Sequence, residues 1–246
     1  MRDYREYGIK RKLSSIRNII CVDSGKGGVG KSTIASILSL ILSKRFDGVG
    51  LLDLDFHGPT CHLILGIPRF QYEEEDGIRP YRHDNILFAS VYPFVGDKYI
   101  AMRGKALSNA LIEFLAIINW GDLHVLVIDM PPGMGDVFLD VVRYFPQARH
   151  LIITTSSILS ISTVSRLLRF LIDHGYDIIG IIENMKIEGL NHVERLAREY
   201  DIKHLGNIPV DQQLESSYGK ADLITQTRAA KAIEGIVDNI IGALQK

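Results

Sequence analysis

A glycine-rich segment lies between a short apolar run and an amphipathic one, and this order limits the folds open to the chain. Residues 25–32 read GKGGVGKS, after NIICVD at 18–23 and before STIASILSLILSK at 32–44. In the last segment the large apolar residues recur with the spacing of one helix face. They are Ile34, Ile37, Leu38, Ile41 and Leu42. The sequence therefore predicts a buried strand, a tight glycine loop and a helix, in that order.

The glycine segment has the composition of a phosphate-binding loop. Its glycines lack Cβ atoms, so backbone N–H groups can turn toward an anion that also faces the positive end of the following helix. Lys31 can reach the β- and γ-phosphates of a nucleotide, and the Ser32 hydroxyl can complete the coordination of Mg²⁺. The predicted nucleotide contacts are Gly25, Lys26, Gly27, Gly28, Val29, Gly30, Lys31, Ser32 and Thr33.

Three aspartates follow apolar runs and are candidates for the chemistry of phosphoryl transfer. Asp53 and Asp55 end the second apolar run, and Asp129 ends the run HVLVID. We expect Asp55 to orient or activate the attacking water, and Asp53, Asp129 and Ser32 to supply the metal shell. The proline- and glycine-dense turn at residues 131–135 is placed to respond to the γ-phosphate.

Two later strand ends carry groups that suit a purine base. An amide such as that of Asn184 presents a donor and an acceptor together, and a proline face such as that of Pro209 can stack on a ring. Asn184, Pro209, Val210 and Asp211 are therefore candidate adenine contacts. Each of these residues is equally compatible with a structural role at the end of its strand.

Apolar runs alternate with helical patterns along most of the chain. This alternation predicts an α/β fold with a mostly parallel, twisted sheet of about seven or eight strands and helices on both faces. The expected strands are 19–22, 49–54, 86–91, 125–128, 151–155, 178–182 and 204–208. We expect a basic arm or lead-in helix at residues 1–17 and a single domain at 18–246. Residues 68–84 are expected to form a mobile surface loop, and Arg228–Leu244 a helix that packs on the sheet.

The composition limits the kinds of partner that the sequence supports. A formal net charge of −1 over 246 residues gives no argument for nucleic acid or an anionic membrane as a partner. The sequence shows no apolar leader and no run approaching the roughly 20 apolar residues of a membrane span, so a cytoplasmic location is expected. Cys21 and Cys61 form no C-x-x-C pair, and we interpret both as small buried or half-buried thiols in a reducing compartment.

Taken together, these motifs resemble the Mrp/ApbC family of nucleotide-binding proteins, from about residue 17 to the C-terminus. The resemblance rests on Lys26 within GKGGVGKS and on DLDFHGPT, WGDLHVLVIDMPPGMGD, IIENM and GNIPVD. This family belongs to the deviant Walker A group, related to MinD, ParA, ArsA and the nitrogenase iron protein. Met102-Arg103-Gly104 with Trp120-Gly121 also resembles the family's tryptophan–arginine–glycine element.

The resemblance implies a P-loop NTPase fold and a homodimer that forms around two ATP molecules. It implies that Lys26 reaches the partner's phosphates, that Asp55 directs the water, and that Asp129 is the Walker B aspartate. Lys26, Lys31 and Asp55 are thus the expected catalytic residues. It also implies that Asn184 and the turn from Pro209 to Asp211 contact adenine.

One family feature is missing from the sequence. Members commonly hold an iron–sulfur cluster between two subunits through a C-x-x-C that follows the E-N-M element, whereas here Glu183-Asn184-Met185 runs into residues 186–191 without a cysteine. Thiolates are the usual cluster ligands, and four are ordinarily needed. Direct cluster binding is therefore not expected, unless two copies of Cys61 form a bridged site in a dimer.

The expected function is a Mg²⁺-dependent homodimeric ATPase with slow, dimer-dependent hydrolysis, connected by resemblance to iron–sulfur cluster assembly. Its candidate partners are iron–sulfur assembly proteins or a cysteine-bearing relative. Two alternatives stay open: a nucleotide-switched positioning ATPase like MinD or ParA, and a nucleotide-binding scaffold with little turnover.

Overall fold

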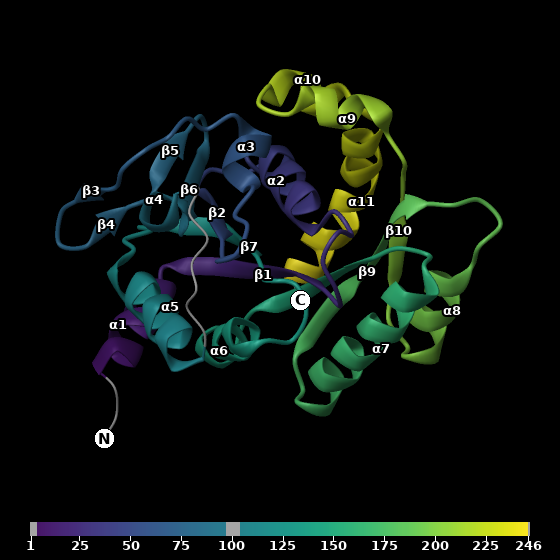
Figure 1. Ribbon diagram of the computed structural model, residues 1–246, viewed down its shortest axis with the longest axis horizontal. Helices are drawn as coiled ribbons and strands as arrows, with labels where there is room; N and C mark the ends of the chain where they lie inside the picture. Colours follow the sequence, from purple (N-terminus) through teal and green to yellow (C-terminus); the bar gives the residue numbers. More distant parts are fainter. Residues whose placement is uncertain (1–3, 97–103, 246) are drawn as a thin grey trace.

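The structure is a computed structural model that describes residues 4–96 and 104–245 (Figure 1). Its centre is a sheet with the strand order β10-β9-β8-β1-β7-β2-β6-β5, in which every neighbouring pair is parallel except β5 with β6. The strands are β1 (Ile16–Ser24), β2 (Val49–Asp53), β5 (Tyr81–His83), β6 (Ile86–Ser90), β7 (Leu123–Asp129), β8 (Arg149–Thr154), β9 (Asp177–Lys186) and β10 (His204–Pro209). The predicted mostly parallel α/β sheet is confirmed.

Helices cover both faces of this sheet, because the strands at its centre are apolar on both sides. One core contains buried residues of α1, α5, α6, α7 and α8, and the other contains buried residues of α2, α3, α10 and α11. Their bounds are α1 (Tyr4–Leu13), α2 (Lys31–Leu42), α3 (Cys61–Leu65), α4 (Tyr92–Val95), α5 (Lys105–Ile117), α6 (Asp136–Tyr144), α7 (Ile158–Asp173), α8 (His192–Glu199), α9 (Gln212–Ser217), α10 (Ala221–Gln226) and α11 (Arg228–Leu244).

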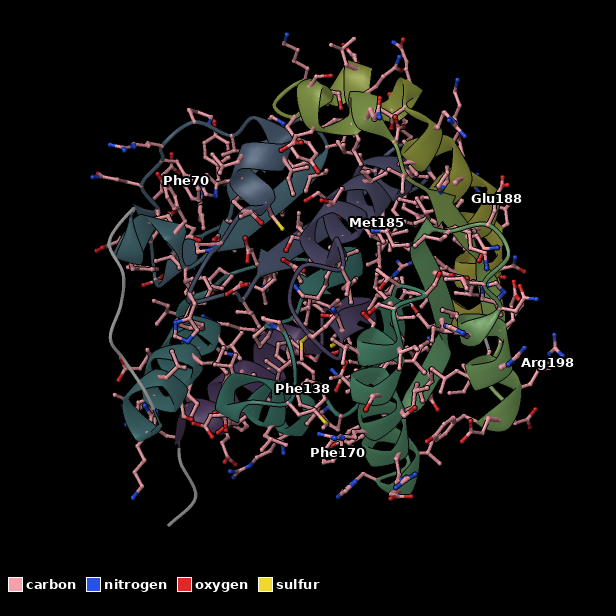
Figure 2. All side chains as sticks on the ribbon, turned by 45° about the vertical axis from the view of Figure 1, so that its right-hand side comes forward. Phe70, Phe138, Phe170, Met185, Glu188 and Arg198 are labelled. Atoms are coloured by element: carbon pink, nitrogen blue, oxygen red, sulfur yellow. The ribbon has the colours of Figure 1, made fainter. Side chains whose placement is uncertain are left out.

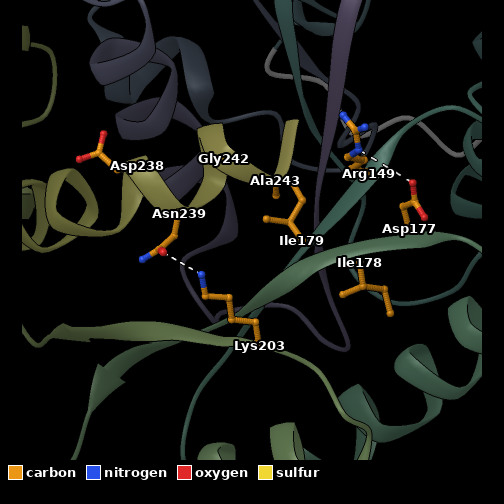
Figure 3. A pocket seen from close by; sticks show the side chains of 9 residues that line it. All are labelled: Arg149, Asp177, Ile178, Ile179, Lys203, Asp238, Asn239, Gly242 and Ala243. Atoms are coloured by element: carbon orange, nitrogen blue, oxygen red, sulfur yellow. Dashed lines mark hydrogen bonds and ion pairs between the residues drawn. The ribbon is translucent and has the colours of Figure 1, made fainter. Parts of the chain in front are cut away.

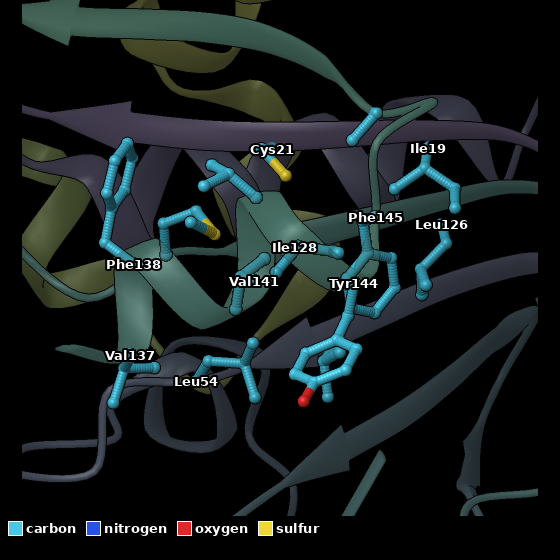
Figure 4. Packing of buried hydrophobic residues seen from close by; sticks show 14 of the residues in the cluster. Ile19, Cys21, Leu54, Leu126, Ile128, Val137, Phe138, Val141, Tyr144 and Phe145 are labelled. Atoms are coloured by element: carbon cyan, nitrogen blue, oxygen red, sulfur yellow. The ribbon is translucent and has the colours of Figure 1, made fainter. Parts of the chain in front are cut away.

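Side chains fill the space between the sheet and its helices (Figure 2). On the first face, Phe138 of α6 packs edge-on against Phe170 of α7, with ring centroids 5.7 Å apart. Figure 4 shows Phe138 in the same core as Cys21 and Ile128. This contact joins α6 to α7 on the same face of the sheet.

The register of the central strands brings three strand ends to one place. Val22 of β1 lies opposite Asp129 of β7, and Asp53 of β2 lies opposite the same Asp129. Because all three strands are parallel, their following loops leave from the same edge of the sheet. The glycine loop and both aspartates therefore meet at this carboxyl edge.

Residues 68–84 are not a loop throughout, whereas their expected mobility stays a prediction. This segment contains β3 (Glu73–Glu74) and β4 (Ile78–Arg79), which pair antiparallel, and then the edge strand β5. It is tied to the sheet by Tyr72, whose hydroxyl donates to Ser90 O at 2.6 Å and accepts from Ser90 N at 2.7 Å. These contacts depend on tertiary structure, so the local proline, glycine and acidic residues gave no sign of them.

Both ends of the chain pack against the domain. Helix α1 buries Ile9 and Leu13 and lies against α5. Strand β1 begins at Ile16, just before the predicted domain boundary at residue 17, and that boundary stays a prediction. Helix α11 has the predicted bounds and buries its apolar stripe against β10 and α2. Met102 and Arg103, part of the proposed tryptophan–arginine–glycine element, lie outside the described residues.

Within residues 4–96 and 104–245, no helix combines the length and the apolar character that crossing a membrane would require.

Candidate nucleotide site

The glycine loop follows β1 and ends at the first turn of α2, as the sequence predicts. Gly28 and Gly30 have φ angles of 78° and 83°, and Gly30 caps the N-terminus of α2. Residues with side chains are strained in this left-handed region, so glycine suits both positions. The loop encloses a pocket of about 210 Å³, lined by Ser24, residues 26–33, Asp55, Thr60 and Pro132.

Neighbouring elements hold the loop in place. Gly133, in the turn after β7, donates its N–H to Ser24 O at 3.0 Å. On the other side, a Cβ on Gly25 would lie 2.6 Å from Val164 N, so α7 packs directly against the loop backbone. The loop is therefore seated between the turn at residues 131–135 and helix α7.

Gly30 also faces the predicted adenine contact. A Cβ at Gly30 would lie 2.3 Å from Asn184 Nδ2, which donates to Val29 O at 2.8 Å, whereas one at Gly28 would meet nothing within 4 Å. We expect Gly30→Ala to destabilise the nucleotide-free protein by about 1 kcal/mol more than Gly28→Ala, because only the former breaks this hydrogen bond. Urea unfolding of both variants checks this, and equal losses would contradict it.

Lys31 forms a buried ion pair with Asp129 at the base of the pocket. Its ammonium donates to Asp129 Oδ1, and the two side chains are 6% and 0% exposed. Burial lowers the pKa of Lys31, but the adjacent Asp129 carboxylate outweighs this effect, so the pKa lies above its ordinary value. Lys31 is thus a charged donor held where the loop can present it to a phosphate.

Asp53 lies beside this pair and gives the site an excess of negative charge. Asp53 Oδ1 accepts from Asp55 N and Oδ2 from Cys61 N, each at 3.1 Å. Burial and the charge of Asp129 raise the pKa of Asp53 to about 7. Two buried carboxylates thus face one ammonium, an arrangement that suits a divalent cation with oxygen ligands. Asp53, Asp129 and the half-buried Ser32 at the start of α2 fit the predicted Mg²⁺.

Asp55 and Lys26 line the mouth of the same pocket, and both are half-buried. Asp55 Oδ1 accepts from His57 N and Gly58 N, both at 3.1 Å. No described residue forms a hydrogen bond with Asp55 Oδ2, and no described carboxylate pairs with Lys26. Each side chain therefore keeps a charged group available to a ligand.

A second pocket, of about 210 Å³, adjoins the first and shares Gly30 and Thr33 with it. Its walls include the four predicted adenine contacts from Asn184 to Asp211. The Asp211 carboxylate is already used by the backbone, since it accepts from Gln213 N and Ala229 N, each at 3.0 Å. It therefore shapes the pocket by capping α9 and anchoring the start of α11.

Several lining residues were missed from the sequence. Tyr218 closes the second pocket, with its hydroxyl 3.1 Å from Thr33 Oγ1. Thr60 and Pro132 line the first pocket. Tyr218 follows the short helix α9 and belongs to no recognisable motif. Thr60 and Pro132 lie within motifs from which only the acidic and glycine residues are assigned roles in the sequence analysis.

Cys61 is buried beside a carboxylate of the candidate site. It begins α3 and is fully buried, with its sulfur 3.4 Å from Asp129 Oδ2. Burial, with the charges of Asp53 and Asp129, raises the pKa of its thiol well above the ordinary value. The sulfur is thus buried in this structure, and the cluster bridged by two copies of Cys61 stays a prediction. Cys21 is fully buried as well.

A larger pocket of about 600 Å³ lies at the opposite, amino edge of the sheet (Figure 3). Its charged side chains already have partners, since Arg149 pairs with Asp177 at 3.9 Å and Lys203 donates to Asn239 at 2.7 Å. None of the predicted site residues lines it. Size therefore does not identify the functional site here, and we assign the site from its chemistry.

Comparisons with known proteins identify the family of this chain. The ParA family model, described as NUBPL iron-transfer P-loop NTPase, matches residues 15–245. An iron-sulfur cluster carrier protein of Synechocystis sp. is 30% identical, over 95% of this chain and 72% of its own length. A protein of the same name from Methanococcus maripaludis is 32% identical, over 100% of this chain and 92% of its own.

A similar solved structure is the nucleotide-binding protein of Archaeoglobus fulgidus in complex with ADP. It has a TM-score of 0.78 and 27% identity, and covers 92% of this chain and 95% of its own. The predicted resemblance is confirmed by these matches. The chain therefore belongs to the family of NUBPL-type iron-transfer P-loop NTPases, whose curated relatives include the iron-sulfur cluster carrier proteins.

Proposed function

We propose that this protein is a Mg²⁺-dependent ATPase that works as a homodimer and serves iron–sulfur cluster handling. The observation that carries the proposal is the pair of adjoining pockets that share Gly30 and Thr33. One is lined by backbone amides and charged groups, which suit a triphosphate, and the other by apolar groups with one amide, which suit adenine. The ADP complex of the similar Archaeoglobus fulgidus protein also supports the proposal of nucleotide binding.

The side chains have distinct proposed roles in hydrolysis. Lys31 exchanges its bond to Asp129 for the β- and γ-phosphates and stabilises the charge that develops there. Asp55 accepts a hydrogen bond from the attacking water through its unengaged oxygen and so orients it. Ser32, Asp53 and Asp129 would hold Mg²⁺, which supplies positive charge to the phosphate oxygens when bound.

Exposed apolar side chains near the loop support a second copy as partner. Ile158 and Leu159 are 74% and 71% exposed in the first turn of α7, the helix packed against Gly25. Met134, 39% exposed, follows Gly133 in the turn bonded to Ser24. Large apolar groups exposed on elements that touch a ligand loop indicate a protein contact. A second copy bound there would bring its own Lys26 near this site.

Lys26→Ala is expected to leave ATP binding to the isolated chain nearly unchanged while slowing hydrolysis about 10-fold or more. The reason is that the proposed contact of Lys26 is a charge-assisted hydrogen bond made only to the partner's phosphates, worth about 1.5–3 kcal/mol. Steady-state phosphate release across a range of protein concentrations measures this. Lys44→Ala, at an exposed lysine just after α2, is the matched control. Undiminished turnover in Lys26→Ala would contradict the cross-subunit role.

The cluster-related role comes from relatives named as carriers, but the two cysteines of this chain are buried. We therefore propose that the ATPase acts together with iron–sulfur assembly proteins or a cysteine-bearing relative. Anaerobic reconstitution with iron and sulfide tests this point. No iron–sulfur cluster absorption is expected for the chain alone, and a stoichiometric cluster on it would overturn the proposal that another protein carries the cluster.

The ATPase itself is tested by calorimetric titration with ATP, GTP and ADP, with and without Mg²⁺. We expect binding of ATP that is stronger with Mg²⁺, and weaker binding of GTP because Asn184 faces the base. Absence of binding by every nucleotide would contradict the proposal.

A further inference from the structure

A thiol lies among the oxygen ligands at the base of the nucleotide site. Cys61 Sγ is 3.4 Å from Asp129 Oδ2, and the Cys61 backbone N–H donates to Asp53 Oδ2 at 3.1 Å. All three side chains are fully buried. Mg²⁺ prefers oxygen ligands and gains nothing from sulfur, so the proposed ATPase cycle does not use this thiol.

The three side chains already have nearly the spacing of metal ligands. One oxygen of each carboxylate and the sulfur lie within 4.8 Å of one another. In a tetrahedral site with a metal–sulfur bond of about 2.3 Å and metal–oxygen bonds of about 2.0–2.2 Å, ligand atoms are roughly 3.3–3.7 Å apart. The pair Cys61–Asp129 meets this spacing, and Asp53 reaches it with a side-chain shift of about 1 Å.

A further, independent feature of this place is an unpartnered buried hydroxyl. The Ser36 hydroxyl, fully buried in α2 near Cys61, has no hydrogen-bond partner among the described residues. A thiolate accepts a hydrogen bond more strongly than a thiol does. The buried hydroxyl is therefore free to donate to a metal-bound sulfur after a small shift.

The charges balance once a divalent ion is bound at this position. In that state Asp53, Asp129 and the Cys61 thiolate carry three negative charges, and Lys31, paired with the other oxygen of Asp129, carries one positive charge. A divalent cation makes the buried set neutral without disturbing the bond from Lys31 to Oδ1. Neutrality matters because an unbalanced buried charge is costly.

We propose that Asp53, Cys61 and Asp129 form a binding site for a thiophilic divalent transition-metal ion of the Fe²⁺, Co²⁺ and Zn²⁺ class. Binding forms one metal–sulfur bond and two metal–oxygen bonds, and the thiol proton leaves to solvent without any change of oxidation state. The site needs no nucleotide. Its competition with Mg²⁺ for the two carboxylates rests on the proposed ATPase function.

The test uses Co²⁺ added to the anaerobic, chelator-washed full chain without nucleotide. We expect saturable binding of one ion per chain and a near-ultraviolet thiolate-to-cobalt charge-transfer band. Cys61→Ser should lose this band, whereas Cys21→Ser, which changes the other buried thiol, should keep it. Co²⁺ binding without the band, or a band that survives in Cys61→Ser, would overturn the proposal.

A measurement on the unaltered protein covers the case in which Cys61→Ser fails to fold. X-ray absorption at the zinc edge of the Zn²⁺-loaded chain should show a sulfur neighbour at about 2.3 Å. A shell of only oxygen and nitrogen would overturn the proposal. Calorimetric titration of the metal-free chain with Mg-ATP is read separately, so failure of nucleotide binding is distinguishable from failure of the metal site.

Discussion

Lys31→Ala is expected to weaken Mg-ATP binding about 100-fold. The ammonium is buried at the base of the loop and forms charge-assisted hydrogen bonds, of which one to a phosphate is worth about 1.5–3 kcal/mol. The substitution also leaves Asp129 and Asp53 without their shared counter-charge, so the triphosphate would meet a more negative site. Calorimetric titration of the variant with Mg-ATP measures the loss.

The control for this substitution is Lys44→Ala, which removes an exposed lysine close to the other end of the same helix. It should bind Mg-ATP as the unaltered chain does. If Lys31→Ala also keeps that affinity, the phosphate role of Lys31 is wrong, and its buried pair with Asp129 serves stability alone. Thermal unfolding of both variants separates loss of binding from loss of the fold.

Asp55→Asn is expected to slow ATP hydrolysis roughly 100-fold while preserving ATP binding. A positioned acid–base group contributes about 10²–10⁴-fold to a rate, and an amide cannot accept the proton. Asparagine keeps an oxygen that can accept from His57 N and Gly58 N, so the loop after β2 should hold its shape. Single-turnover hydrolysis at saturating Mg-ATP measures the rate of the chemical step.

Asp47→Asn, at an exposed aspartate before β2, is the control for the change of charge. Turnover by Asp55→Asn at the rate of the unaltered chain would show that another group orients the water. An equal loss in Asp47→Asn would show that the effect comes from net charge and not from position.

The repeating parts of the fold were predictable from the sequence. Each of the seven expected strands is present. Apolar runs that alternate with helical patterns can form few arrangements other than a parallel sheet covered by helices in a domain of this size. The edge strand β5 was missed, because its few residues include Arg82 and His83 and because it is held by pairing with β6. Tyr72 ties the preceding segment to this edge by hydrogen bonds with Ser90, and no local sequence pattern predicts these bonds.

The candidate site was predictable to the extent that motifs follow strand ends. The parallel register places Asp53 and Asp129 opposite each other, so their proximity follows from the fold class. The position of Cys61 did not follow, since it depends on how residues 54–60 turn before α3 begins. The capping role of Asp211 was also hidden, because its partner Ala229 lies in another helix.

The most direct test of the central claim is the mass of Asp55→Asn in solution, measured by light scattering with and without Mg-ATP. The account predicts a dimer that holds two ATP molecules when Mg-ATP is present, and its loss when Lys26→Ala is added to the same chain. A monomer at saturating Mg-ATP, or a dimer that forms equally well without nucleotide and without Lys26, would contradict the account.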